Sequence, residues 1–173
     1  LCFERYQYRV RAINSKKQFT SGSNYKLLRP LYSFPGNIVS KRTTVENDEY
    51  VLTEWIDNDS AENDHYIIDR FDPEMGWQED FAISNVERFT DEMVEVDNKP
   101  YSYRVRSEDV CGYQDSMPSE PINSILLTGM VSEDQTWLKW NSYPKVLPGK
   151  MYYRIELKDI DGQFQFVDSL PSN

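Results

Sequence analysis

A nine-residue stretch in which polar and apolar side chains alternate occurs twice in this chain. It reads YQYRVRAIN at residues 6–14 and YSYRVRSED at residues 101–109, 95 positions later, and five of the nine positions are identical. The tyrosines and the valine fall on one face and the arginines on the other, which is typical of a half-buried strand. A repeat of this length with one such strand per copy predicts an array of small β-sandwich modules.

The order of the other patterns divides the chain into three units. We expect residues 1–33 to be the C-terminal strands of a first module, residues 34–127 to be a complete module, and residues 128–173 to be the N-terminal half of a third. Trp140 and Tyr153 stand in the third unit where Trp55 and Tyr66 stand in the second. Seven strands are expected in the second unit, at 38–44, 50–56, 66–71, 77–83, 92–96, 101–109 and 121–127.

Charge is unevenly distributed and excludes some classes of partner. Residues 1–33 hold seven Lys/Arg and one acidic residue, residues 34–126 hold seven and 22, and the net charge of the chain is −10. An acidic middle repels nucleic acid and anionic membranes, so we expect no nucleic-acid partner. No run of 18 apolar residues is present, so no membrane insertion is expected either. The sequence begins without a signal-peptide pattern, and we expect it to be a segment of a larger protein.

These residues resemble the fibronectin type III family. The family pattern has a Trp at the end of the second strand, matched by Trp55 and Trp140, and a Tyr in the third strand, matched by Tyr66 and Tyr153. Its sixth strand, Tyr-x-Val-x-Val-x-Ala-x-Asn, is matched by the repeated stretch. The resemblance implies an all-β fold of tandem immunoglobulin-like sandwiches, one complete and two partial. It implies a structural core that includes Trp55, Tyr66, Tyr101, Tyr103, Val105, Trp140 and Tyr153, and a tyrosine corner at Tyr6 and Tyr101.

A narrower resemblance is to the tandem sandwich modules of Bacteroidota surface proteins, many of them gliding-motility or adhesin-like proteins exported by the type IX secretion pathway. It is carried by FTD at residues 89–91, the repeated strand, VCG at 110–112 and PS at 118–119. It implies O-glycosylation at Ser60, Ser116 and Ser169, each in an Asp-Ser-hydrophobic triplet in or near an expected loop. The sorting domain of that family is not in this sequence.

Candidate chemistry is sparse. His65 is the only histidine and adjoins an acidic loop, so we interpret it as a surface residue and expect no catalytic residues. Cys2 and Cys111 lie at different strand offsets, so we expect no disulfide between them. Acidic neighbours also argue against a reactive Cys111. Weak candidates for a Ca²⁺ site are Asp57, Asp59, Glu62 and Asp64, against the simpler reading of a solvated loop, and no other cofactor is expected.

We therefore expect a non-enzymatic spacer and adhesion-type segment of a secreted or cell-surface protein. Its expected partners are neighbouring modules of the same chain and other surface or secretion-complex proteins. The alternative is an accessory module of a secreted polysaccharide-degrading enzyme, in which Trp77 or Trp137 would contact glycan. A receptor ectodomain is a third reading, disfavoured because the paired cysteines usual in cytokine receptors are missing.

Overall fold

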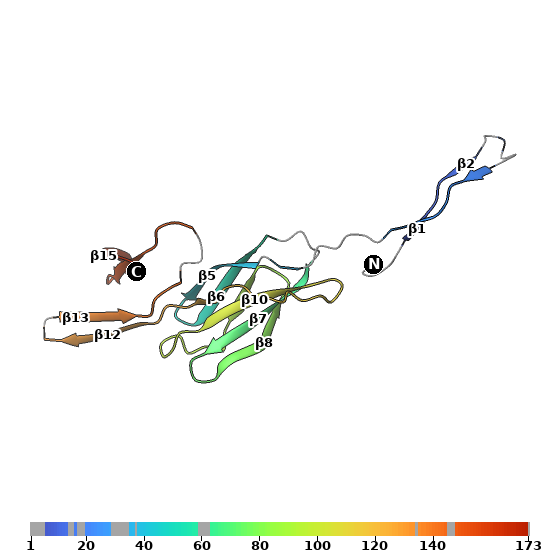
Figure 1. Ribbon diagram of the computed structural model, residues 1–173. Helices are drawn as coiled ribbons and strands as arrows, with labels where there is room; N and C mark the ends of the chain where they lie inside the picture. Colours follow the sequence, from blue (N-terminus) through green and yellow to red (C-terminus); the bar gives the residue numbers. More distant parts are fainter. Residues whose placement is uncertain are drawn as a thin grey trace.

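The chain is all-β. The computed structural model describes residues 6–13, 16, 20–28, 35–36, 38–58, 63–133, 135–144 and 148–172, and every regular element in them is a β-strand (Figure 1). Within these residues no helix long and apolar enough to cross a membrane is found. The strands form a central unit of two sheets and, before and after it, two-stranded hairpins.

The central unit contains seven antiparallel strands in two sheets. One sheet has the order β5-β6-β9 and the other the order β11-β10-β7-β8. The first consists of β5 (Ile38–Glu46), β6 (Tyr50–Asp57) and β9 (Arg88–Asp91), and the second of β7 (Asn63–Asp72), β8 (Gly76–Ser84), β10 (Ser102–Asp109) and β11 (Ile122–Asn123). This arrangement fits the β-sandwich class.

Alternation along the strands builds the core between the two sheets. Buried and half-buried residues alternate without a break along β10, as the period of two in its sequence requires. The buried apolar cluster joins both sheets and consists of Ile38, Val51, Trp55, Tyr66, Ile68, Tyr101, Tyr103 and Val105. At its centre the indole of Trp55 meets the ring of Tyr66 edge to face, with 5.3 Å between the ring centroids.

Tyr101 ties the start of β10 to the chain that precedes it. Its ring is 2% exposed, and its hydroxyl oxygen accepts a hydrogen bond of 3.0 Å from the backbone N–H of Glu95. This is the local backbone bond that the family resemblance implies for Tyr101. The segment before it is therefore pinned to the sandwich by a side chain.

Replacing Tyr101 with phenylalanine removes this bond and keeps the ring. We expect the free energy of unfolding to fall by about 1 kcal/mol, because one buried hydrogen bond is lost and the Glu95 N–H is left unpaired. Urea denaturation followed by tryptophan fluorescence measures the change. An unchanged midpoint would show that the hydroxyl bond contributes nothing.

Buried carboxylates on both faces of the second sheet are paired with arginine side chains. Arg70 donates to the carboxylate of Asp91 at 2.9 Å, and the two side chains are only 6% and 1% exposed. On the opposite face of the same sheet, buried Asp69 accepts from Arg104 at 2.8 Å and from Arg106 at 3.2 Å. Each carboxylate is thus compensated by guanidinium donors, as buried charge requires.

Aromatic rings extend this arginine network. The guanidinium of Arg104 lies 4.3 Å from the ring centre of Trp77, which also packs on Phe71 at 5.5 Å. That of Arg70 lies 3.8 Å from the ring centre of Phe81. Cation–π contacts of this kind hold the arginine side chains in one geometry.

The turn between β7 and β8 is held by Asp72. Its carboxylate accepts the backbone N–H of Glu74 at 2.8 Å and pairs with the ammonium of Lys99 at 3.0 Å. Burial alone raises the pKa of Asp72, but these donors outweigh it and lower the pKa below its ordinary value. Gly76 completes the turn with φ of 79°, which a glycine adopts without strain.

This lowered pKa predicts a pH-dependent contribution to stability. Because the carboxyl binds its proton more weakly in the folded state, its contribution is complete above about pH 4 and is lost as the pH falls through the folded-state pKa. We expect an Asp72→Asn variant to lose less stability than the unmodified chain between pH 7 and pH 3. Urea midpoints at both pH values test this, and equal losses would contradict it.

The N-terminal unit is a ribbon of paired short strands (Figure 1). In it β1 (Tyr6–Tyr8) pairs with β4 (Lys26–Leu28), and β2 (Arg11–Ile13) pairs with β3 (Thr20–Gly22). The stretch expected to form one strand is therefore divided at Arg9 and Val10. At this point the hydroxyl of Ser23 accepts the N–H of Val10 at 2.9 Å, and the N–H of Ser23 donates to the carbonyl oxygen of Val10 at 2.8 Å. Val105 and Ser119 make the same two bonds in the central unit, where β10 is continuous and is also paired with β7.

The C-terminal unit consists of two hairpins. β12 (Leu127–Ser132) pairs with β13 (Gln135–Trp140), and β14 (Tyr152–Lys158) pairs with β15 (Phe164–Pro171). Trp140 and Tyr153 contact edge to face, with ring centroids 5.5 Å apart, much as Trp55 and Tyr66 do. Both are half-exposed, which corrects their assignment to a structural core. The reason is that, within the described residues, each of these hairpins is a sheet of only two strands, and further strands of the kind that β9 and β10 add to the central unit are missing there.

Two expected strands of the central unit differ from the structure. Residues 92–96 are irregular, with a bend at Met93 and a turn that begins at Val96, and the strand lies at β9. Asp91 accepts the N–H of Met93, and the N–H of Glu95 donates to the hydroxyl of Tyr101, so neither N–H is available for a strand pairing. The closing strand expected at residues 121–127 is reduced to β11. There the side chain of Asn141 donates to the carbonyl oxygen of Ser124 and accepts the N–H of Leu126, so the chain turns toward the next hairpin.

Candidate functional site

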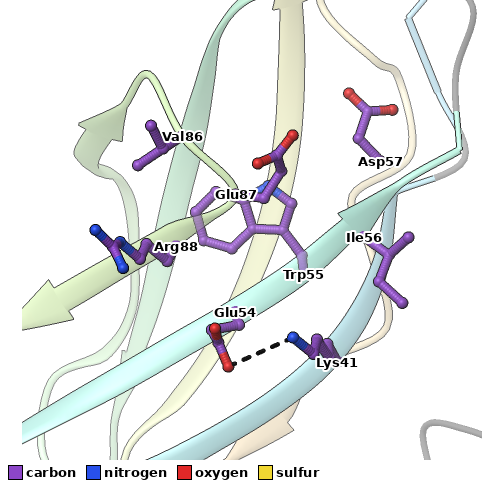
Figure 2. Close-up of a pocket in the computed structure, with 8 residues that line it drawn as sticks. All are labelled: Lys41, Glu54, Trp55, Ile56, Asp57, Val86, Glu87 and Arg88. Atoms are coloured by element: carbon purple, nitrogen blue, oxygen red, sulfur yellow. Dashed lines mark ion pairs between the residues drawn. The ribbon is translucent and has the colours of Figure 1, made fainter.

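A hollow of about 530 Å³ lies where strands β6 and β9 separate. Its floor is Trp55, and its walls carry both signs of charge (Figure 2). The lining residues are Lys41, Glu54, Trp55, Ile56, Asp57, Val86, Glu87 and Arg88. We take this hollow as the candidate site because charged side chains surround a large aromatic ring there.

The local backbone explains why the strands separate. The register of β6 with β9 ends at the pair Glu54–Arg88. Beyond it the N–H of Trp55 donates to the carbonyl oxygen of Glu87 at 3.2 Å. The hydroxyl of Ser84 then donates to the carbonyl oxygens of Val86 and Arg88 and holds the turn that forms one wall.

The carboxylate of Glu54 is paired with two cationic side chains. It pairs with Lys41 at 3.8 Å, drawn in Figure 2, and more closely with Arg42. The hydrogen bond from Arg42 lowers the pKa of Glu54, against the opposing effect of burial, and the same bond raises the pKa of Arg42. Glu54 is therefore a carboxylate acceptor at neutral pH and not a proton donor.

The indole nitrogen of Trp55 is the least satisfied atom of the site. It is buried and has no hydrogen-bond partner in the described part of the protein. A buried N–H donor without an acceptor costs free energy, so a water molecule or a ligand oxygen in the hollow would stabilise it. Asp57, which also lines the hollow, does not bond to this indole; its carboxylate accepts the hydroxyl of Tyr66 at 2.9 Å and the amide of Asn63.

The hollow is chemically suited to binding a polar group. It offers the cations Lys41 and Arg88, the carboxylates of Glu54 and Glu87, and one indole donor. The residues that line it include no serine, cysteine or histidine, so they hold no nucleophile–base pair of the kind that acyl transfer needs.

The residues proposed for Ca²⁺ are not brought together as far as the structure describes them. Asp57 bonds to Tyr66 and Asn63, while Asp64 bonds to the imidazole of His65 at 3.0 Å. Asp59 and Glu62 lie outside the described residues. Among the residues that are described, no group of three or more acidic, histidine or cysteine side chains could hold a metal ion.

The other reactive side chains are placed as follows. His65 is half-buried on β7, and its imidazole bonds to the carboxylate of Asp64. Cys111 is disulfide-bonded. Because the sequence has only two cysteines, this contradicts the expectation that Cys2 and Cys111 do not pair; Cys2 itself lies outside the described residues. Strand offsets within repeats were a poor guide, since they do not fix the distance between neighbouring repeats.

The predicted glycosylation positions differ in environment. Ser116 is exposed in a bend of the loop after β10, so a glycan there would not disturb the hydrogen bonds of a strand. Ser169 is exposed but lies within β15, opposite Arg154, so its placement in or near a loop was wrong. Ser60 lies outside the described residues.

The two candidate sugar-stacking tryptophans are not equivalent. Trp77 is 37% exposed, and the guanidinium of Arg104 already lies over its ring. Trp137 is 59% exposed and borders a second hollow of about 360 Å³ formed by β12 and β13. Trp137 is therefore the more accessible of the two.

Sequence reasoning missed most of the hollow. Trp55 was singled out as a core residue, and Glu54, Glu87 and Arg88 were not singled out at all. Their proximity depends on where β6 and β9 part, which no local pattern encodes. The arginines of the second sheet had a detectable signal, because Arg104 and Arg106 fall on the polar face of the repeated strand.

Comparison with known proteins leaves the family open. No protein-family model matches the sequence, and no curated protein matches it. Among solved structures, the chain is similar to the crystal structure of a β-1,2-glucanase from Parabacteroides distasonis, at 19% sequence identity and a TM-score of 0.41. The similarity covers 60% of this chain and 15% of the glucanase chain. A similarity at this TM-score carries no argument about fold or activity.

Proposed function

We propose that this chain is a non-catalytic segment of tandem fibronectin type III-like modules that acts as a spacer and protein-interaction region of a secreted or cell-surface protein. The observation that carries the proposal is the repeated structural plan. The central unit is a sandwich of three and four strands, and its neighbours repeat its strands with the same key residues.

The repetition extends to individual contacts. The edge-to-face pair of Trp55 and Tyr66 recurs as Trp140 and Tyr153, with similar centroid distances. Gly76 and Gly162 both have φ of 79° in the turns that follow β7 and β14. Repetition of this kind supports residues 1–33, 34–127 and 128–173 as parts of three copies of one module.

The nature of the surface supports a role in contacts rather than in chemistry. The candidate hollow offers paired charges and one indole donor, and its lining residues include no serine, cysteine or histidine. A region built in this way binds polar groups of a partner and spaces the modules on either side. The exposed acidic residues Asp48 and Glu49, in the turn between β5 and β6, suit such contacts.

Labelling of intact cells from the native source tests whether this segment is exposed at the cell surface. A membrane-impermeant amine reagent should modify Lys41, which is 48% exposed, whereas Lys99, 15% exposed and paired with Asp72 and Glu74, is the internal control and should react weakly. Peptide mapping of the same sample would show any added glycan mass at Ser116. Labelling of Lys41 only after the cells are lysed would overturn the surface assignment.

The exposure of Trp137 favours one alternative, an accessory module that contacts carbohydrate. An exposed indole beside a shallow hollow can stack on a sugar ring. Electrophoresis through gels that contain soluble polysaccharides tests it, with Trp137→Ala as the variant and Trp77→Ala as the comparison. Retardation that Trp137→Ala alone removes would favour the alternative, and equal mobility in every gel would exclude it for those polysaccharides.

A further inference from the structure

The joint between the central unit and the third unit is held by side chains from both. The two C-terminal hairpins lie beyond one end of the central sandwich (Figure 1). A single covalent connection would leave two such units free to turn relative to each other, which is the default where the interface between modules is small. The hydrogen bonds at this end of the sandwich remove that freedom.

The first set of contacts joins the chain that follows β11 to the chain that follows β13. The side-chain amide of Asn141 donates to the carbonyl oxygen of Ser124 at 2.9 Å, and its oxygen accepts the N–H of Leu126 at 2.7 Å. The amide of Asn123 donates to the carbonyl oxygen of Ser142 at 3.1 Å. These bonds fasten the end of β13 to the chain that leaves the sandwich.

The chain that follows β11 is itself anchored in the sandwich. Ser124 is 2% exposed. Its N–H donates to the carbonyl oxygen of Tyr101 at 2.8 Å, and its hydroxyl accepts the N–H of Tyr101 at 3.0 Å. Because Tyr101 belongs to the buried cluster, Asn141 bonds to a fixed part of the central unit.

A second contact is made to the other sheet. The hydroxyl of Tyr143 accepts a hydrogen bond of 2.9 Å from the backbone N–H of Thr43, which lies on β5 and 100 positions earlier in the chain. β5 is the edge strand of its sheet, and an edge presents backbone donors of this kind. Thr43 is 3% exposed, and its hydroxyl bonds to that of Thr53 at 2.9 Å, so this donor is fixed in the first sheet.

Tyr143 is in turn fixed in the third unit. Its N–H donates to the hydroxyl of Tyr153 at 2.8 Å. The ring of Tyr153 packs edge to face on that of Trp140. A continuous line of hydrogen bonds therefore runs from β5 through Tyr143 to β14.

We propose that Asn141 and Tyr143 lock the third unit onto the central sandwich, so that the two units move as one rigid body. The bonds of Asn141 hold the third unit in position, and the bond of Tyr143 to β5 stops rotation about that point. In a spacer, such a lock sets the direction in which the following module points. This role rests on the function proposed above, whereas the lock itself is a property of the purified chain.

The lock is not part of the repeated module plan. Asn141 and Tyr143 are the first and third residues after Trp140, and the residues at the same positions after Trp55 are Ile56 and Asn58. An isoleucine lacks the side-chain amide that bonds Ser124 and Leu126, and an asparagine lacks a phenolic hydroxyl. The central unit therefore does not carry the same pair of residues for fastening itself to the unit before it.

Heteronuclear NMR relaxation of the full chain tests the lock, because it reports the rotational correlation time of each unit separately. In the unmodified chain the amides of β5–β10 and those of β12–β14 should give the same correlation time. In the double variant Asn141→Ala, Tyr143→Phe, the value for β12–β14 should fall by at least about a third, while that for β5–β10 changes little.

The matched control is Tyr152→Phe. Tyr152 precedes Tyr153 on β14 and is 66% exposed, so the loss of its hydroxyl should leave both correlation times unchanged. None of the substituted residues belongs to the buried cluster of the central unit, so the melting transition of the sandwich should be the same in every variant.

Hydrogen exchange at a single amide tests the contact itself. In Tyr143→Phe the N–H of Thr43 loses its acceptor and should exchange at least about tenfold faster. The amide of Thr53, on the neighbouring strand β6, should exchange as before.

Different correlation times for the two units in the unmodified chain would overturn the proposal and leave the spacer function standing with a flexible joint. Equal times in the double variant would refute the assignment of the lock to Asn141 and Tyr143. Equal times in the unmodified chain, together with Lys41 labelled only after cell lysis, would refute the proposed function and keep the lock.

Discussion

Replacing Trp55 with alanine is expected to lower the free energy of unfolding by about 3–5 kcal/mol, which is the range for truncating a large buried ring. The indole is 3% exposed and packs edge to face on Tyr66 at the centre of the cluster that joins both sheets. Its loss leaves a cavity that the two sheets cannot fill without moving. Thermal unfolding followed by circular dichroism measures the change, and the midpoint should fall by more than ten degrees.

The matched control for this prediction is Trp137→Ala. Trp137 is also a strand tryptophan but is 59% exposed, so its removal should change the unfolding of the central unit little. The same loss in both variants would mean that Trp55 has no special place in the core. A Trp55→Ala variant that melts like the unmodified chain would lead to the same conclusion.

Replacing Asp91 with alanine is the second large effect, again about 3–5 kcal/mol, because it leaves a buried guanidinium without its carboxylate. Arg70 is 5% exposed and donates to Asp91 at 2.9 Å. The hydroxyl of Tyr103 donates to the same carboxylate oxygen at 2.9 Å and would also lose its acceptor. Burial and the neighbouring carboxylate raise the pKa of Tyr103, so this hydroxyl stays a donor at every physiological pH.

Two further variants separate the effect of burial from that of charge. Glu79→Ala removes a carboxylate that is 72% exposed and pairs with Arg104 at 3.3 Å, and it should cost less than about 1 kcal/mol. The double variant Arg70→Met, Asp91→Leu should recover much of the loss seen with Asp91→Ala, because no unpaired charge remains. Equal costs for Asp91→Ala and Glu79→Ala in urea titrations would rule out the buried-pair account.

The strands could be predicted from the sequence where apolar and polar residues alternate, because this alternation indicates a strand with one buried face. β6, β7, β8, β10, β13 and β14 all lie where alternating aromatic and β-branched residues placed them, within a few residues at each end. The strand at residues 92–96 was wrong because this irregular segment is held by the side chains of Asp91 and Tyr101, which bond to its backbone N–H groups. Side-chain bonds of this kind depend on tertiary contacts, which local patterns do not report.

The candidate site was much less predictable than the strands. The hollow at Trp55 arises because β6 and β9 part after the pair Glu54–Arg88, and strand separation leaves no mark in the sequence. The half-exposure of Trp140 and Tyr153 was missed for a related reason. Their sequence pattern is that of core residues, but burial depends on which strands cover them.

Native-state hydrogen exchange of the full chain at dilute concentration tests the central claim most directly. That claim is that the central unit is a sandwich with a buried core and that its neighbours, within the described residues, are two-stranded hairpins without one. Backbone amides of β5 to β10 should exchange slowly and together, and those of β1 to β4 and β12 to β15 should exchange many times faster. Equal protection of all three units would contradict the account.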